Sequence, residues 1–362
     1  MKKPAHGPSL YYATDKNIYS ALNQHKIDMP TVLKLFEYRN TVASKKTPRE
    51  DLAQYFARLP HDYNDHKTIA GKLGVVPRRE RITSMDLAEA DSAKLGLAID
   101  ELKKELEKTG DVVHVAKSGE NITVSIRYTT IDYNKSEFTQ VQKLDGVIEL
   151  VKSGHGYVVR STQNEYINKA REGVLNKLDK LSDTPVARVA ISLFDIPRNT
   201  LRSKFFDELM KTLPGFSRQD VTDVYVYKPK PETDSTDDSE VTDEEGDSHV
   251  ERVLLRGSGI SRSPLLDDLR SSYHIVKVGW TAKELLGAGN VYDIEAVFSN
   301  PKDCVGFSFL LSGIYPLDEK GIVTKKRRPP LLSEIEKLSL AIEKRSRELV
   351  ASLKLEFQQL KE

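Results

Sequence analysis

The chain of 362 residues contains a single cysteine, Cys304. One cysteine cannot form an intramolecular disulfide, and secreted proteins usually carry cysteines in pairs. The first residues also lack the apolar segment of a secretory signal, because Met1-Lys2-Lys3-Pro4 is followed by polar residues such as Asp15 and Lys16. We therefore expect a protein of the reducing cytoplasm, or of the nucleus if the source is a eukaryote.

Long apolar runs and a net charge of either sign are also missing. No stretch approaches the roughly 18 apolar residues that a membrane span requires, so we expect a soluble protein without a membrane partner. Lys and Arg number 55, and Asp and Glu number 54. This balance neither indicates nor excludes nucleic acid as a partner, and any electrostatic signal must be local.

Recognisable catalytic motifs are absent as well. The sequence has no His-Glu-x-x-His, no Cys-x-x-Cys, no Gly-x-Ser-x-Gly and no P-loop. Asp293 and Glu295 lie on an expected strand, but Ala296 and Val297 follow where a nuclease-like motif needs a lysine. We expect no cofactor and no metal and favour a non-enzymatic protein. An enzyme of unrecognised type, with carboxylates that converge from distant positions, stays an alternative.

The length predicts a multi-domain α+β protein. We expect, in order, an N-terminal extension (1–27), a helical domain (28–110), a small α+β middle domain (111–183), a ferredoxin-like domain (184–330) and a C-terminal amphipathic helix (331–362). In the helical domain, Thr47-Pro48-Arg49-Glu50 has the spacing of a capping box, and a longer helix is expected to begin near Ser84. In the middle domain, turn residues at 118–121 and 153–156 predict two hairpins.

The ferredoxin-like prediction comes from the order of elements after residue 184. We expect a strand over 186–194, a helix over 199–213, strands over 221–227 and 250–256, a helix over 263–272 and a strand over 275–280. This order is β-α-β-β-α-β, the arrangement of ferredoxin-like folds. Two further strands, over 292–298 and 305–312, are expected to extend or cover the sheet.

One face of this sheet is the first candidate site. Alternation along the expected strands places the following aromatic and basic residues on the face away from the helices: Arg188, Phe194, Tyr225, Tyr227, Arg252 and Arg256. Aromatic rings and arginines together favour base stacking with phosphate contacts. The sheet resembles that of an RNA-recognition motif in architecture only, because the third strand lacks that family's aromatic positions. Alternatively, the aromatics pack beneath the extra strands or another domain.

A second candidate is a helix-turn-helix over residues 47–82. Two short helices could pack across the turn that follows Pro60, as in DNA-binding helical units. The cations available for phosphates are Lys67, Lys72, Arg78, Arg79 and Arg81. An ordinary helical bundle has the same pattern and is the alternative.

A third candidate is the glycine-containing turn Gly257-Ser258-Gly259-Ile260-Ser261-Arg262. Gly257 and Gly259 would let the backbone approach an anion, with Arg262 beside it and a helix N-terminus at Ser263. However, the third glycine of a dinucleotide fingerprint and the lysine of a P-loop are missing. A plain strand-to-helix turn is the alternative.

Two segments could regulate or extend these sites. Residues 231–248 are acidic, with no Lys or Arg between Glu232 and Asp247, so we expect a disordered loop. The loop could compete with phosphates for Arg188, Arg252 and Arg256, or it could be a solvated insertion. The C-terminal helix could bind a partner or form a homodimer seam, or it could pack on its own protein.

The leading hypothesis is a non-enzymatic protein that binds DNA or RNA, with a regulatory role or a place in a larger complex. It would combine an N-terminal helical DNA-binding element with a C-terminal sheet that binds a strand or a partner. The main alternative is a protein-interaction or scaffold subunit without nucleic-acid binding.

Overall fold

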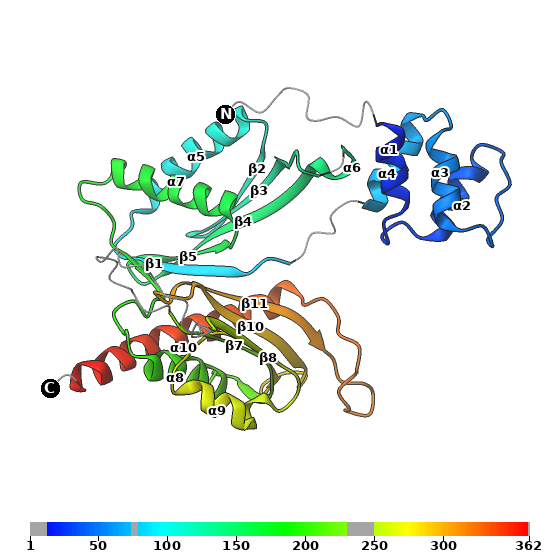
Figure 1. The fold of residues 1–362 in the computed structure, drawn as a ribbon. Helices are drawn as coiled ribbons and strands as arrows, with labels where there is room; N and C mark the ends of the chain where they lie inside the picture. Colours follow the sequence, from blue (N-terminus) through cyan, green and yellow to red (C-terminus); the bar gives the residue numbers. More distant parts are fainter. Residues whose placement is uncertain (1–12, 74–78, 136, 230–249, 361–362) are drawn as a thin grey trace, which may run out of the picture. The chain divides into compact units, whose positions relative to one another are not determined.

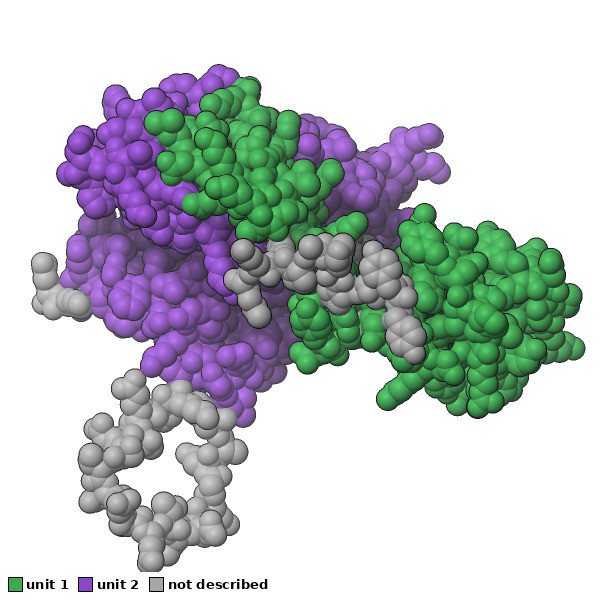
Figure 2. Space-filling model, turned by 90° about the horizontal axis from the view of Figure 1, so that it is seen from above, with its two compact units in different colours: residues 1–78, 96–118, 122–147 green, residues 79–95, 119–121, 148–362 purple. Residues whose placement is uncertain are grey.

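The computed structural model describes residues 13–73, 79–135, 137–229 and 250–360. Helices and strands are mixed, and the strands pair in antiparallel fashion, so the α+β class is confirmed. The chain forms two compact units, shown in green and purple in Figure 2: residues 1–78, 96–118 and 122–147, and residues 79–95, 119–121 and 148–362. The domain boundaries predicted at residues 110 and 183 stay predictions.

The first unit contains four helices around one apolar core. They are α1 (Asp15–Leu22), α2 (Met29–Glu37), α3 (Arg49–Ala57) and α4 (Tyr63–Leu73). Thr14 caps α1 and Asp28 caps α2, each accepting a hydrogen bond from a backbone N–H three residues later. The core is filled from all four helices by Ile18, Leu22, Leu35, Phe36, Leu52, Phe56, Ile69 and Leu73. The capping box predicted at Thr47 does not form, because α3 begins after Pro48 without a side-chain cap.

The following elements are α5 (Ser92–Lys108), β2 (Val112–Ser118), β3 (Asn121–Ile131), α6 (Glu137–Gln140), β4 (Val141–Ser153), β5 (Gly156–Thr162) and α7 (Glu165–Leu181). Both predicted hairpins are present, with Gly119 (φ 60°) and Gly154 (φ 57°) in the left-handed conformation that their turns require. The helix predicted to begin near Ser84 is wrong at its start. Residues Ile82–Leu87 form strand β1, which pairs with β5.

The remaining elements, all in the second unit, are β6 (Arg188–Ala190), α8 (Asn199–Lys211), β7 (Phe216–Tyr227), β8 (Arg252–Arg256), the short 3₁₀ helix η1 (Ile260–Arg262), α9 (Pro264–Arg270), β9 (His274–Glu284), β10 (Val291–Asn300), β11 (Val305–Tyr315) and α10 (Leu332–Gln359). The strand order within this unit is β5-β1-β11-β10-β9-β7-β8, with the end of β4 beside β5 (Figure 1). The two strands predicted to extend the sheet do so as β10 and β11.

The ferredoxin-like prediction is wrong in its strand pairing. That fold places its first strand inside the sheet, whereas β6 has only three residues and pairs with β1. Ile191 and Leu193 are buried in the core from a loop, and the Leu193 N–H bonds to the Cys304 carbonyl at 3.0 Å. Val189 of β6 is 61% exposed. The apolar alternation of this segment therefore reflects an anchored loop rather than a long strand.

The core of the second unit lies between its sheet and helices α8, α9 and α10 (Figure 1). Phe205 and Phe206 of α8 contact the rings of Phe298 and Phe307, and Trp280 is fully buried. Helix α10 buries Leu338, Ile342, Leu349 and Leu353 against this core. Each such leucine contributes about 2 kcal/mol of burial free energy. Intramolecular docking of the C-terminal helix, one of the two expected alternatives, is thus present.

A buried ion pair also joins α10 to β5. Arg160 Nε and Nη2 donate to Glu343 Oε1 and Oε2 at 2.7 and 2.9 Å, and the two side chains are 5% and 2% exposed. Burial opposes the charged form of Arg160, but Glu343, with smaller contributions from Glu149 and Glu336, outweighs it and the pKa of Arg160 is raised. One helical turn further on, Arg347 lies 2.6 Å from Asp86 of β1.

The expected disordered acidic loop, residues 231–248, lies outside the described residues. Just outside it, the Lys228 N–H donates to the Glu251 carbonyl at 2.9 Å, a hydrogen bond that continues the pairing of β7 with β8. Among the helices that the structure describes, none is long and apolar enough to cross a membrane.

Candidate nucleic-acid interface

Helices α8 and α9 pack on one face of β7 and β9, and the opposite face of these strands carries polar residues. Tyr225 of β7 pairs with Leu254 of β8 and Lys277 of β9. Two residues along β7, Asp223 pairs with Arg256 and Gly279. Because Val224 and Val278 point into the core, side chains at the alternate positions lie on the opposite face.

We call this surface the polar sheet face. Its members are Asp223, Tyr225, Arg252, Leu254, Arg256, Lys277, Asp293 and Glu295. Gly279 lies at its centre, and a Cβ atom there would come within 3.1 Å of Asp223 Oδ2. A glycine at this position therefore leaves room for the Asp223 carboxylate.

Ion pairs connect the strands across the polar sheet face. Arg256 Nε donates to Asp223 Oδ1 at 2.6 Å, and Lys277 Nζ lies 2.7 Å from Glu295 Oε2. The other Glu295 oxygen accepts from Arg81 Nε at 2.7 Å. The hydrogen bond to Asp223 raises the pKa of Arg256. The surface thus alternates cations with carboxylates that are only about one fifth exposed.

Asp293 is a second carboxylate that β10 contributes to this face. Burial raises the pKa of the Asp293 carboxyl, although Arg327 donates to it at 2.5 Å and opposes the change. Arg327 belongs to the basic run Lys325-Lys326-Arg327-Arg328, which thus contributes one of its side chains to this face.

Strand β8 presents the most exposed part of the face and ends the strand order of the described unit. Arg252 and Arg256 point outward with side chains 55% and 76% exposed, and Leu254 lies between them at 48%. The Arg252 guanidinium lies over the Tyr227 ring, 5.9 Å from its centroid. Such alternating positions are roughly 7 Å apart along a strand.

The structure brings Tyr225, Arg252 and Arg256 together but not the rest of the predicted sheet set. Tyr227 pairs with Arg252, but it is only 7% exposed, because its ring packs on the His274 ring and the Arg252 guanidinium lies over it. Tyr227 is therefore covered and does not offer its ring for stacking on a base. Arg188 bonds to Asp179 of α7 and lies 3.5 Å from Glu172, away from β7 and β8. Phe194 is 60% exposed in the loop after β6 rather than on a strand.

The cations of the predicted helix-turn-helix divide between the two units. Lys67 and Lys72 are exposed on α4, and Lys67 Nζ lies 6.0 Å from the Tyr63 ring centroid. Arg79 donates to the Leu311 carbonyl at 3.2 Å in the second unit, where Arg81 also lies. Arg78 lies outside the described residues. The two short helices are present as α3 and α4, and DNA recognition by them stays a prediction.

The glycine turn after β8 uses its N–H groups internally. Gly259, in the left-handed conformation at φ 70°, donates to Asp220 Oδ1 at 2.9 Å, and Gly257 donates to the Thr222 carbonyl at 3.0 Å. The Asp220 carboxylate thus occupies the place expected for an external anion. Arg262 is exposed on η1 beside this turn. This geometry favours the plain strand-to-helix turn.

Sequence reasoning missed the carboxylates of the polar sheet face. Asp223 and Glu295 alternate with apolar residues on β7 and β10, and this pattern could have placed them on the same face as Tyr225. Within the described ranges, no group of three or more His, Cys, Asp or Glu side chains is arranged to hold a metal ion. No protein-family model matches the chain, and a search of curated proteins returns no match.

Proposed function

We propose that the protein is a non-enzymatic nucleic-acid-binding protein that uses the polar sheet face. The carrying observation is the exposed pair Arg252 and Arg256 on either side of Leu254, with Tyr225 on the neighbouring strand. Guanidinium groups bind phosphates in bidentate fashion, and an aromatic ring offers a surface on which a base stacks.

The existing ion pairs are compatible with this function. Exposed pairs such as Arg256 with Asp223 contribute little to stability, so a phosphate can replace the carboxylate as the acceptor. Lys277 and Arg81, which both form ion pairs with Glu295, provide two further cations beside the polar sheet face. A single strand fits this surface better than a duplex, because a stacking contact needs an unpaired base.

The test measures binding of labelled single-stranded DNA and RNA of about 20 nucleotides by fluorescence anisotropy over a range of salt concentrations. The double variant Arg252→Glu/Arg256→Glu should bind more than about tenfold more weakly. Its slope of log affinity against log salt should fall by about 1.4, since each phosphate contact of a single strand contributes about 0.7. Arg198→Glu, an exposed position just before α8, is the matched control and should bind like the wild type.

Substitutions of Tyr225 distinguish the contribution of base stacking to affinity from that of charge. Tyr225→Ala should weaken binding by about 1–3 kcal/mol without changing the salt slope, and Tyr225→Phe should retain most of the affinity because it keeps the ring. Equal affinities for the wild type, the double arginine variant and Tyr225→Ala would contradict the proposal.

The four-helix part of the first unit is proposed as a second DNA-binding element. Its support is limited to the exposed Lys67 and Lys72 on α4, which follows α3 after a short turn. Lys67→Glu/Lys72→Glu should reduce affinity for duplex DNA and leave single-strand binding by the sheet unchanged. Unchanged duplex binding in this variant would contradict the second element.

A further inference from the structure

Exposed aliphatic side chains lie on three segments of the second unit that are joined near the start of α10: the β9–β10 turn, the loop that contains residues 322 and 323, and residues 331 and 332. The members of this aliphatic end are Leu285, Leu286, Ile322, Val323, Leu331 and Leu332. Leu286 and Leu332 are 75% and 86% exposed. Single exposed leucines are common on proteins, but a group of them on adjoining segments is typical of an interaction site.

The turn between β9 and β10 is unusually apolar. Leu285, Leu286, Gly287, Ala288 and Gly289 contain no charged or hydrogen-bonding side chain, although turns usually favour polar residues. The turn has a defined shape, because Gly287 and Gly289 have φ values of 131° and 70°. A Cβ atom at Gly287 would lie only 2.7 Å from Glu284 Oε1, so the turn folds closely over that side chain.

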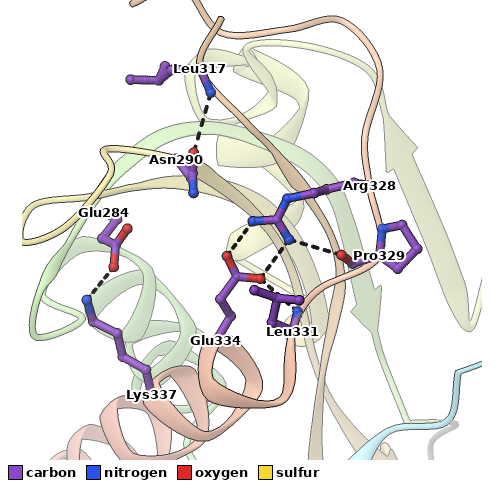
Figure 3. A network of polar contacts seen from close by, with 8 residues as sticks. All are labelled: Glu284, Asn290, Leu317, Arg328, Pro329, Leu331, Glu334 and Lys337. Carbon is purple, nitrogen blue, oxygen red and sulfur yellow. Dashed lines mark hydrogen bonds and ion pairs between the residues drawn. The ribbon is translucent and has the colours of Figure 1, made fainter.

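Polar contacts attach this turn to α10 (Figure 3). Lys337 of α10 bonds to the Glu284 carboxylate, and its Nζ donates to the Leu286 carbonyl at 2.7 Å. On the other side, the Leu317 N–H donates to Asn290 Oδ1 at 3.4 Å, and Leu317 pairs with Val323 in an isolated bridge.

The start of α10 is fixed by a second part of the same network (Figure 3). Arg328 Nη1 and Nη2 donate to Glu334 Oε2 and Oε1 at 2.8 and 2.6 Å, and Glu334 also accepts from the Leu331 N–H at 2.8 Å. The hydrogen bonds from Arg328 lower the pKa of Glu334, so the carboxylate stays charged. The segments that carry the aliphatic end are therefore held in place before any partner binds, which reduces the entropy lost on binding.

The charges around the aliphatic end are mainly basic. Lys283, Lys325 and Lys326 are exposed, and none of them forms an ion pair within the described part of the chain. The loop that carries Ile322 also has two exposed carboxylates, Asp318 and Glu319, beside the exposed Lys320; Asp318 accepts from the Lys320 and Ile322 N–H groups at 2.9 and 2.8 Å. The exposed lysines thus outnumber the exposed carboxylates. A second copy would bring like charges together, which disfavours self-association through this surface.

We infer that the aliphatic end is a docking site for a protein partner that presents an amphipathic helix with an aliphatic stripe flanked by Asp and Glu. The apolar residues would pack on the leucines, and the acidic flanks would pair with the exposed lysines. A lipid surface fits less well, because the aliphatic end contains no Trp or Tyr, the residues enriched where proteins meet a membrane interface. This inference goes beyond nucleic-acid binding and uses different residues.

The test uses the full chain and a synthetic helical peptide of about 18 residues with a leucine stripe flanked by glutamates. In a second peptide, lysines replace the glutamates. The glutamate peptide should bind at least about tenfold more tightly than the lysine peptide, and the difference should shrink as salt rises. Leu286→Ser/Leu332→Ser should lower the affinity for the glutamate peptide at least about fivefold. Leu355→Ser, which alters an exposed leucine in the last turns of α10, is the matched control and should not.

A charge variant keeps the test decisive if the leucine variant does not fold. Lys325→Glu/Lys326→Glu should lower the affinity for the glutamate peptide and raise the affinity for the lysine peptide. Equal binding of the two peptides, absence of binding up to about 1 mM, or an equal loss in Leu355→Ser would overturn the inference. The inference would also be overturned if the peptide does not bind and the protein instead forms a dimer, or binds phosphatidylserine vesicles, in a way that Leu286→Ser/Leu332→Ser abolishes.

Discussion

His274 gives the sharpest test of the second unit, because it is a fully buried imidazole at the start of β9. Its Nδ1 lies 3.1 Å from Asn199 Oδ1 and its Nε2 lies 2.9 Å from the Pro301 carbonyl. Burial lowers the pKa of His274 from 6.5 to about 4, and the nearby Arg202 acts in the same direction. At neutral pH the ring is therefore neutral and donates through one of its two nitrogens, to the Asn199 side chain or to the Pro301 carbonyl.

The lowered pKa makes stability depend on pH with a definite sign. Above about pH 6.5 the imidazole is neutral in both the folded and the unfolded chain, so the full stability is present. As the pH falls toward 4, the unfolded chain binds a proton that the folded protein excludes. The free energy of unfolding should fall by about 1.4 kcal/mol for each pH unit in this window. Between the pKa values of 6.5 and about 4, the total is about 3 kcal/mol.

The measurement is urea unfolding followed by the fluorescence of Trp280, the single tryptophan, which is buried in the same unit. His274→Gln removes the titrating group and keeps a donor for Pro301. Because other groups titrate alike in both proteins, the difference between wild type and variant isolates His274. The wild type should lose about 2–3 kcal/mol more than His274→Gln between about pH 7 and pH 4.5. Parallel pH curves for the two proteins would refute a buried neutral histidine.

Three further substitutions or reactions test other parts of the fold. Glu343→Gln leaves Arg160 buried without its carboxylate and should lower the free energy of unfolding by about 3–5 kcal/mol, whereas the double variant Arg160→Met/Glu343→Leu should recover most of this loss in urea unfolding. Gly156→Ala should lower the thermal midpoint strongly, because its Cβ would lie 1.9 Å from the Leu87 carbonyl oxygen. Burial raises the pKa of the Cys304 thiol to about 11, so a thiol reagent should react with it slowly at about pH 8 until urea unfolds the protein.

Local features of the fold could be predicted from the sequence where the signal was short-range. The turn glycines Gly119 and Gly154 marked both hairpins, and the helices predicted over 199–213 and 263–272 are present as α8 and α9. These elements depend on residues within a few positions of one another, so a single sequence contains the relevant pattern.

The errors came from partners that are distant in the sequence. Residues around Ser84 were predicted to be helical, but they form β1, whose strand partners begin about 70 residues later. β6 was predicted to be a long strand inside the sheet, yet its ladder is with β1 rather than with β7 or β9. The pattern of neighbouring residues does not show which distant strand a segment pairs with, or in which register.

The polar sheet face shows the same limit at the level of side chains. Alternation placed Tyr225, Arg252 and Arg256 on one surface, but it could not show that Tyr227 is covered by His274, a residue 47 positions further along the chain. The pairing of Arg81 with Glu295 joins residues 214 positions apart, so sequence spacing could not show that Arg81 belongs to this surface.

The ion pair between Arg160 and Glu343 has a consequence for the order in which the protein folds during synthesis. The two residues are 183 positions apart, so β5 emerges long before Glu343, the buried carboxylate that accepts two hydrogen bonds from Arg160. At about 5–20 residues per second, translation of the intervening chain takes roughly 10 to 40 s. Throughout that interval Arg160 has only the exposed Glu149 of β4, 3.9 Å away, as an ionic partner, and the buried pair that joins β5 to α10 forms after α10 has been synthesised.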